Sequence, residues 1–284
     1  MTLEEHVLAF KENGYTVFSN FRSPEWVAKI RAVLDPEFDD LFADDAQVRR
    51  KKIVPLLGHE VLGPILKDHA LDPLMLDFAE MVMGPFVQLD SYEVSGFPIR
   101  DVSEKGDPDR WHRDAFHTAA QWAGPYKTQG RLHEHKPYTP PLACNCLTYL
   151  QDMNEETGPF RMVPGSHLDF TVIPKEQEHE QHPRQKFLTL KAGDMVFLHH
   201  DVLHTGTWNI SNQYRYFISN YVCRIGLPHR DTFDLPVIHE IMAEAREKND
   251  LRTLRFFGED DSFVKRQEAM WRKLAEEDRA VLKN

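Results

Sequence analysis

The first residues of the chain carry the pattern of an amphipathic helix. Apolar side chains recur at helical spacing, at Leu3, Val7 and Phe10. Thr2 and Glu5 fit the T-x-x-E capping box that precedes many helices, and Gly14 is of the residue type that most often follows a helix end. The pattern predicts a helix that ends before Gly14, followed by a short strand over residues 15–18.

Proline marks two further helix starts in the N-terminal third. Pro24 follows a serine and opens a segment with an apolar face, formed by Trp26, Ile30, Val33 and Leu34. Pro73 follows an aspartate and opens another helix, which ends near Gly84. We therefore expect residues 1–84 to form a helical support, and apolar positions among many charges predict a helical tail from about residue 238.

The middle of the chain changes to short β-like runs separated by turn-forming clusters. They lie at 86–95, 142–150, 160–163, 186–190, 195–199, 202–208 and 214–224. This rhythm predicts a mainly β fold with flanking helices, a jelly roll or a barrel.

We expect a single domain over residues 1–284. Its core would be residues 85–228, and 229–284 would be a C-terminal helical extension. Residues 115–141 do not fit the strand rhythm, and a long insertion in a compact β domain is often a lid or binding loop.

The composition limits the possible partners. Lys and Arg number 34 against 45 Asp and Glu, a net charge of −11. This acidity counts against nucleic-acid binding and against an anionic membrane surface, and it favours a neutral or cationic small-molecule substrate. The sequence has no apolar run near the roughly 18 residues of a membrane span, and it begins with acidic residues, unlike a signal peptide. We therefore expect a soluble, cytoplasmic protein. The sequence does not predict its oligomeric state. Its cysteines are expected to be buried, reduced thiols, at Cys144, Cys146 and Cys223.

Candidate metal ligands occur at two places. His112 and Asp114 form an H-x-D pair, and residues two apart in an extended backbone point to the same side. Further candidates follow downstream, at His199, His200, Asp201 and His204. Two histidines and one carboxylate form the facial triad of non-haem Fe(II) oxygenases, which leaves coordination positions open.

The position of Arg215 favours His204 as the third ligand. If residues 209–212 form a hairpin loop, Gly206 pairs with Arg215, and His204 lies on the same face one step further from the turn. Arg215 would then reach beside the metal, opposite a residue with no side chain. That arrangement leaves room for a small dicarboxylate held by the guanidinium.

In this order the residues resemble the phytanoyl-CoA dioxygenase family. The resemblance rests on H-x-D, the turn TGPFRMVPGSH, the pattern GD-x-V-x-L-x-x-x-x-x-H and an arginine eleven residues after that histidine. The opening FKENGYTVFSNF is also similar, and the likeness covers roughly residues 6–225. The family's members are Fe(II)- and 2-oxoglutarate-dependent oxygenases with a double-stranded β-helix core.

The resemblance implies that His112, Asp114 and His204 bind Fe(II) and that Arg215 holds the distal carboxylate of 2-oxoglutarate. With O2 as the other cosubstrate, we expect hydroxylation of an unactivated C–H bond of a small molecule, with release of succinate and CO2. The alternative is a cupin-like metal-binding protein without 2-oxoglutarate chemistry, acting as an isomerase, a hydrolase or a binding module.

The sequence departs from the family pattern at Gly206, where many members carry Ser or Thr. We expect Thr148 or Asn145 to supply the missing hydrogen bond to 2-oxoglutarate. Other side chains are predicted to line the substrate pocket, namely Phe116, Trp122, Arg100 and Trp208.

Several other polar residues are expected to have no role in the chemistry. The basic run at residues 49–52 is predicted to be a solvated surface, with contact to a CoA phosphate as the less favoured alternative. His133 and His135 are predicted to be a solvated loop, with metal binding as the less favoured alternative. His167 is predicted to be a turn residue bonded to backbone, and His199 and His200 a strand end with one ring packed and one solvated.

Overall fold

The computed structural model describes residues 1–43, 48–101, 103, 109–114, 140–169, 173–224 and 234–259. They belong to two compact units, Met1–Thr232 and Phe233–Asn284. The expected insertion at 115–141, apart from its last two residues, and the tail beyond residue 259 lie outside the described residues. The organisation as one domain stays a prediction.

Helices dominate the first part of unit one. They are α1 (Leu3–Asn13), α2 (Pro24–Ala43), the 3-10 turn η1 (Leu56–Gly58), α3 (Leu62–Ala70) and α4 (Pro73–Met83). The predicted capping box is present, since Thr2 Oγ1 accepts from Glu5 N at 3.3 Å and the Glu5 carboxylate accepts from Thr2 N at 2.7 Å. Gly14 ends α1 at φ +80°, a backbone conformation that favours glycine. Helix α3 was not predicted.

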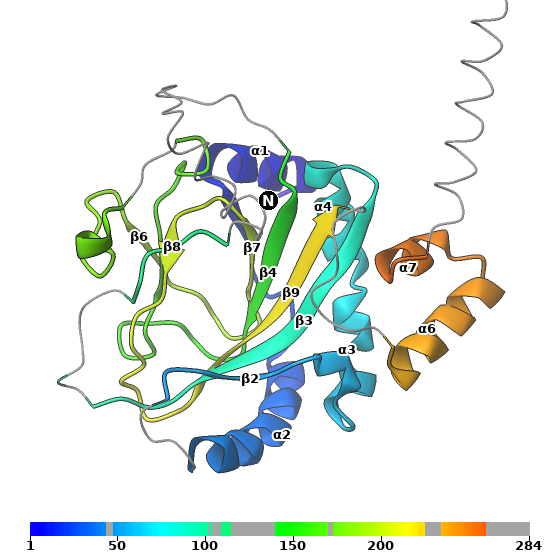
Figure 1. Cartoon of the computed structure of the whole chain (residues 1–284), viewed down its shortest axis with the longest axis horizontal. Helices are drawn as coiled ribbons and strands as arrows, with labels where there is room; N and C mark the ends of the chain where they lie inside the picture. The colour runs from blue at the N-terminus through cyan, green and yellow to red at the C-terminus, as the bar shows by residue number, and fades with distance from the viewer. Residues whose placement is uncertain are drawn as a thin grey trace, which may run out of the picture. The chain divides into compact units, whose positions relative to one another are not determined.

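The strands of the described residues form two antiparallel sheets, as expected of a jelly roll (Figure 1). The larger sheet has the order β1-β7-β4-β9-β3-β2, and the smaller one has the order β6-β5-β8. The larger sheet comprises β1 (Tyr15–Phe18), β2 (Lys51–Ile53), β3 (Val87–Phe97), β4 (Ala143–Tyr149), β7 (Met195–His199) and β9 (Arg215–Arg224). The smaller comprises β5 (Phe160–Met162), β6 (Lys186–Leu188) and β8 (His204–Thr205), with the 3-10 turn η3 (Lys175–Gln177) before β6. The predicted strand at 202–208 shrinks to two residues, and β2 was not predicted.

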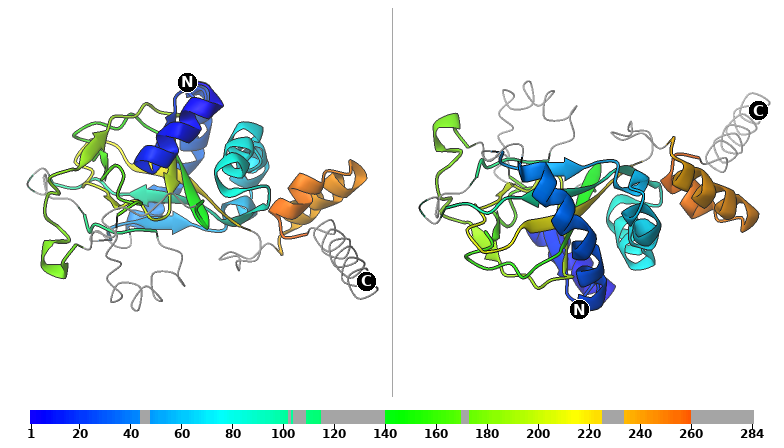
Figure 2. Two further views of the ribbon diagram at one scale, coloured as in Figure 1. Left: turned by 90° about the horizontal axis from the view of Figure 1, so that it is seen from above. Right: turned by 90° about the horizontal axis from the view of Figure 1, so that it is seen from below.

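The helices of unit one pack on one face of the larger sheet. Figure 2 shows α1 to α4, coloured blue to cyan, on the same side of the strands. Phe78 of α4 contacts Phe10 of α1 and Phe197 of β7, with ring centroids 5.8 and 4.8 Å apart. This aromatic core leaves the opposite face of the sheet to the residues of the candidate site.

The second unit contains two described helices, α6 (Pro236–Glu247) and α7 (Leu251–Phe256). Their buried faces include Ile238, Ile241, Leu254 and Phe256. Among all the described residues, no helix is long and apolar enough to cross a membrane.

Candidate active site

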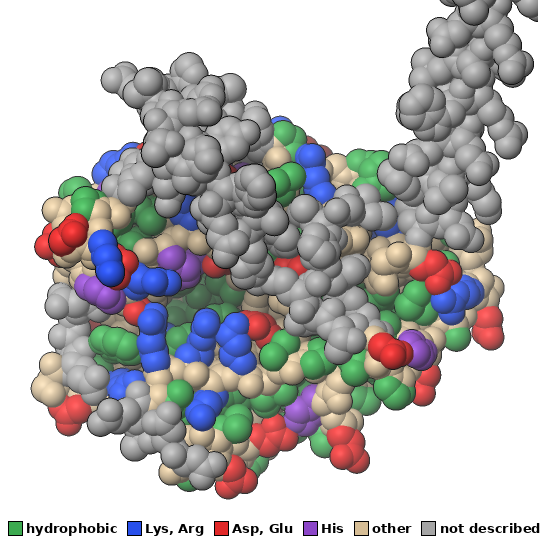
Figure 3. Space-filling view, in the orientation of Figure 1, with side chains coloured by type: hydrophobic (Ala, Val, Ile, Leu, Met, Phe, Trp, Pro, Cys, Tyr) green, Lys and Arg blue, Asp and Glu red, His purple; other side chains and the backbone are tan. Residues whose placement is uncertain are grey.

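A cavity of about 590 Å³ lies in the first unit. It is lined from β2, β3, β4, β5, β8 and β9 and from the segment 109–114. Figure 3 shows basic side chains gathered around the hollow on this face. The cavity thus receives side chains from both sheets.

His112, Asp114 and His204 converge inside this cavity. Residues 112 and 204 form an isolated antiparallel bridge, so their imidazoles lie side by side with centroids 4.3 Å apart. Asp114 Oδ1 lies 3.8 Å from His112 Nε2 and 3.7 Å from His204 Nε2. The three groups each offer one ligand atom within 4.8 Å of the others.

Backbone carbonyls fix the orientation and the tautomer of both rings. Nδ1 of His112 donates to Arg110 O, and Nδ1 of His204 donates to Val202 O, each at 2.9 Å. Because a carbonyl only accepts, Nε2 of each neutral ring carries the lone pair that a metal needs. Desolvation by the cavity walls, with the nearby His204 ring, lowers the pKa of His112 to about 4, although its cavity-facing surface is accessible. His112 is therefore neutral at pH 7, and the donor set fits Fe(II).

Asp114 is oriented by its neighbours. Asn145 Nδ2 donates to Asp114 Oδ2 at 3.1 Å, and Asn145 Oδ1 accepts from Ser219 Oγ at 2.6 Å. Tyr221 donates its hydroxyl to the Asp114 carbonyl at 2.8 Å. With Oδ2 held in this way, Oδ1 faces the two histidines. Asn145 therefore lines the cavity next to the carboxylate, and its expected hydrogen bond to 2-oxoglutarate stays a prediction.

Arg215 lies at another wall of the cavity, and it is buried. Its Nη1 donates to Gly158 O at 2.7 Å, to Thr207 O at 2.6 Å and to Thr157 O at 3.3 Å. Burial lowers the pKa of Arg215 to about 10, so it stays charged at neutral pH. A side chain at Gly206 would begin 3.6 Å from Nη2, an ordinary contact distance, so Nη2 faces a space without a side chain.

The predicted proximity of Arg215 and Gly206 is found, but the predicted hairpin is not. Strand β8 pairs with β5, whereas β9 pairs with β3 and β4. The chain passes from one sheet to the other between residues 205 and 215. The guanidinium thus approaches Gly206 across the gap between sheets rather than along a ladder.

Thr148 was predicted wrongly. Its hydroxyl bonds to His69 Nε2 at 3.0 Å on the helix-covered face of β4. Asn145 and Thr148 are three residues apart, so an unbroken strand sends their side chains to opposite faces. Only Asn145 of the two lines the cavity.

None of the predicted substrate-pocket residues is among the described residues that line the cavity. Phe116 and Trp122 lie outside the described residues. Arg100 and Trp208 are absent from the described lining; the Arg100 guanidinium lies 5.3 Å from the Trp208 ring and donates to Val48 O at 2.9 Å. The aromatic lining that the sequence did not single out comprises Phe97, Tyr149, Phe160, Phe217 and Tyr221. Strand alternation around Asn145 and Arg215 could have identified Tyr149, Phe217 and Tyr221.

The other histidines are mostly structural. His167 Nε2 donates to Lys11 O at 3.0 Å, as predicted for a turn residue. His199 and His200 are both buried and stacked, so the expectation that one is solvated was wrong. With Asp201 they form a second group of possible ligands. His133 and His135 lie outside the described residues, and the three cysteines are buried thiols, as predicted.

Comparison with known proteins assigns the class of this chain. The model of the phytanoyl-CoA dioxygenase (PhyH) family matches residues 10–217. The chain belongs to this family and is an Fe(II)- and 2-oxoglutarate-dependent dioxygenase. The alternative of a metal-binding protein without this chemistry is therefore set aside.

Individual relatives agree with the assignment. Ectoine dioxygenase of Bordetella parapertussis is 26% identical over 239 residues, covering 73% of this chain and 70% of the relative. The Fe(II)/2-oxoglutarate-dependent dioxygenase nvfF of Aspergillus novofumigatus is 26% identical over 219 residues, covering 72% and 65%.

Solved structures share the fold. HygX of Streptomyces hygroscopicus, with nickel, 2-oxoglutarate and hygromycin B bound, has a TM-score of 0.58 at 15% identity, covering 83% of this chain and 92% of HygX. The 2-oxoglutarate-dependent epimerase SnoN from nogalamycin biosynthesis has a TM-score of 0.55 at 21% identity, covering 82% and 89%. The jelly-roll prediction is confirmed.

Proposed function

We propose that this dioxygenase hydroxylates an unactivated C–H bond of a small molecule, using iron held by His112, Asp114 and His204 and 2-oxoglutarate held by Arg215. The observation that carries the proposal is that both histidine Nε2 atoms and Asp114 Oδ1 meet in the cavity that Arg215 also lines. When bound, Fe(II) with 2-oxoglutarate and O2 supplies the oxidant, with release of succinate and CO2.

The chain's own residues prepare the reaction in three ways. The two Nδ1–H···O bonds orient both imidazoles with Nε2 toward the cavity, and Asn145 holds the carboxylate. The Arg215 guanidinium offers a fixed charge to a distal carboxylate. The aromatic walls limit water around the reacting C–H bond.

An anaerobic titration with Fe(II) and 2-oxoglutarate tests the two binding roles. We expect a weak visible charge-transfer band in wild type and a much weaker one in Arg215→Ala. Arg31→Ala is the matched control, because Arg31 also donates to backbone carbonyls, those of Leu150 and Tyr214, without lining the cavity. Equal bands in wild type and Arg215→Ala would refute the role of Arg215.

Hydroxylation itself is tested by succinate release across a metabolite panel. A true substrate stimulates succinate formation and gains one oxygen atom from labelled O2, and Asp114→Ala abolishes both. Product that gains no oxygen atom would show that the outcome is not hydroxylation. The cytoplasmic location and the lack of nucleic-acid and membrane partners stay predictions from composition.

A further inference from the structure

The cavity carries more positive charge than the proposed cofactors need. Its described lining includes cationic side chains, at Arg49, Arg50, Lys52, Arg110 and Arg215. It also includes carboxylates, at Glu93, Asp109 and Asp114. This local excess contrasts with the net charge of −11 for the whole chain.

Two of the cations are paired within the protein. Lys52 Nζ lies 2.5 Å from Glu93 Oε1, and Arg49 forms an ion pair with Asp109. These pairs leave Arg50 and Arg110, both exposed, in the lining of the same cavity. The basic run was predicted to be an ordinary solvated surface, but Arg49, Arg50 and Lys52 of this run face the cavity.

The proposed cofactors do not neutralise these two arginines. A divalent metal with Asp114 and doubly charged 2-oxoglutarate leaves one negative charge, which Arg215 balances. Arg50 and Arg110 also oppose their neighbours: both lower the pKa of Arg49, after desolvation as the largest cause, and Arg50 contributes to lowering that of Arg215. Like charges held around one concavity are stabilised when an anion enters it.

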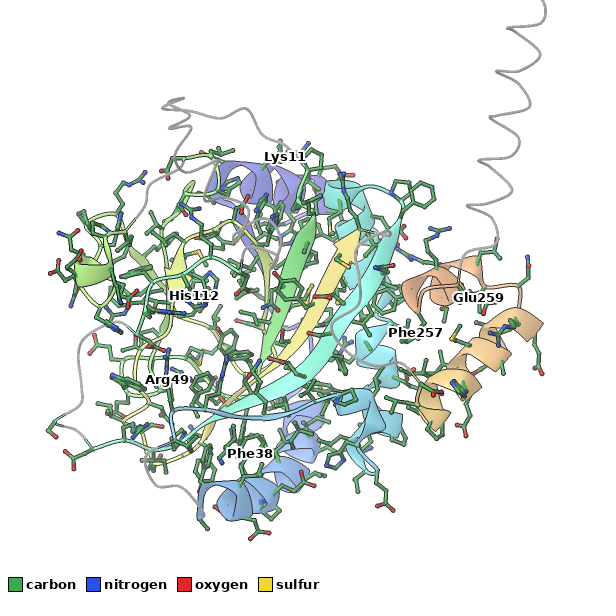
Figure 4. All side chains as sticks on the ribbon, viewed as in Figure 1. Lys11, Phe38, Arg49, His112, Phe257 and Glu259 are labelled. Carbon is green, nitrogen blue, oxygen red and sulfur yellow. The ribbon has the colours of Figure 1, made fainter. Side chains whose placement is uncertain are left out.

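Part of the remaining lining is apolar. Leu147, Met153 and four aromatic rings, those of Phe97, Tyr149, Phe160 and Phe217, face the same space. A ligand that satisfies both surfaces has an apolar body and an anionic end. Figure 4 shows Arg49, next to Arg50 in the chain, in the same part of the molecule as His112.

We propose that the substrate of this dioxygenase is an amphiphilic anion whose carboxylate or phosphate is bound by Arg50 and Arg110, with its apolar body between the aromatic walls. The proposal rests on the proposed function, because it assigns the metal and Arg215 to the cofactors. It replaces the neutral or cationic substrate that overall acidity favoured.

Calorimetric titration of protein loaded with nickel(II) and saturating 2-oxoglutarate tests the proposal. The probes are benzoate, phenyl phosphate and the neutral benzamide. We expect at least one anion to bind about tenfold more tightly than benzamide, as charge-assisted hydrogen bonds would give, and this preference to weaken with added salt. The tighter anion identifies the group as a carboxylate or a phosphate.

Variants assign the preference to the two arginines. Arg50→Gln/Arg110→Gln should remove it, whereas Lys29→Gln/Lys175→Gln, which removes the same charge at exposed sites outside the cavity lining, should keep it. Three results would overturn the proposal. They are equal binding of benzamide and the anions, no binding of any probe at millimolar concentration, and a preference for the anion that survives in Arg50→Gln/Arg110→Gln.

A prior titration of each variant with 2-oxoglutarate separates the two hypotheses. We expect 2-oxoglutarate affinity to fall less than the anion affinity in Arg50→Gln/Arg110→Gln. If wild type binds no 2-oxoglutarate, the proposed function fails. If it binds 2-oxoglutarate but prefers no anion, only the substrate class fails.

Discussion

His112 and His204 exchange both backbone hydrogen bonds, His112 N to His204 O at 3.0 Å and His204 N to His112 O at 2.9 Å. They are far apart in the sequence, and within the described residues this is the only β-bridge that joins the segment 109–114 to a strand. A metal bound by both rings would therefore fasten that segment to the smaller sheet.

Metal should accordingly stabilise the folded protein. At a free metal concentration about 100 times Kd, linkage gives about 2.7 kcal/mol, a rise of several degrees in Tm. We expect the rise with Fe(II) under anaerobic conditions in wild type and in His179→Ala, an exposed histidine, but not in His204→Ala. Thermal denaturation with and without metal measures it, and a full rise in His204→Ala would contradict the assignment.

Asn145 should act on the metal through Asp114. Asn145→Ala removes the donor to Asp114 Oδ2 and frees the carboxylate to turn, so we expect a loss of about 10–100-fold in metal affinity. Competition with a chelator measures this affinity. Thr148→Ala, on the opposite face of the same strand, is the control and should change it little. Equal affinities in the two variants would exclude this positioning role.

Gly158 should be essential for the position of Arg215. It has φ +79°, and a Cβ there would lie 2.5 Å from Arg215 Nη1 and 2.5 Å from Thr207 O. We expect Gly158→Ala to weaken 2-oxoglutarate binding strongly. Gly165→Ala carries similar strain, at φ +76°, but meets only Glu12 O at 3.7 Å, so it should lose about 1–2 kcal/mol of stability and keep 2-oxoglutarate affinity. Similar 2-oxoglutarate affinities in Gly158→Ala and Gly165→Ala would show that the Cβ at residue 158 does not displace Arg215.

Gly206→Ser should be tolerated. The added Cβ would lie 3.6 Å from Arg215 Nη2, and the hydroxyl would add a hydrogen-bonding group near the cosubstrate. One further hydrogen bond of about 0.5–1.5 kcal/mol corresponds to a gain of roughly 2–10-fold in 2-oxoglutarate affinity. Titration of the charge-transfer band measures the gain, with Gly206→Ala as the control without a hydroxyl. Weaker 2-oxoglutarate binding in Gly206→Ser but not in Gly206→Ala would mean that the serine hydroxyl has no room beside the cosubstrate.

The sequence predicted those elements whose ends have local signals. Helices α1 and α4 begin at capping residues, and their positions were predicted closely. Helix α3 follows Val61, whose side chain makes no capping bond, so its apolar face at Leu62, Leu66 and Ala70 has no start signal beside it. Strand β2 is a short edge strand in a basic run and has no apolar alternation to detect.

Strand parity and the family pattern predicted that the three metal ligands converge. They did not predict which other residues line the cavity. Parity could have separated Asn145 from Thr148, because only one of them can face the metal. The location of Arg50 depends on β2 pairing with β3, a contact between residues 51–53 and 94–96 that no local pattern encodes.

The three carbonyl bonds to Arg215 Nη1 have a consequence for the length of the cosubstrate. A guanidinium tied to Gly158, Thr207 and Thr157 cannot retreat when a longer molecule enters, nor advance toward a shorter one. If one end of 2-oxoglutarate is bound at the metal, the fixed position of Arg215 would set the distance at which the other carboxylate can be bound. We therefore expect the enzyme to reject 2-oxoadipate, which is one methylene longer, by geometry rather than by charge.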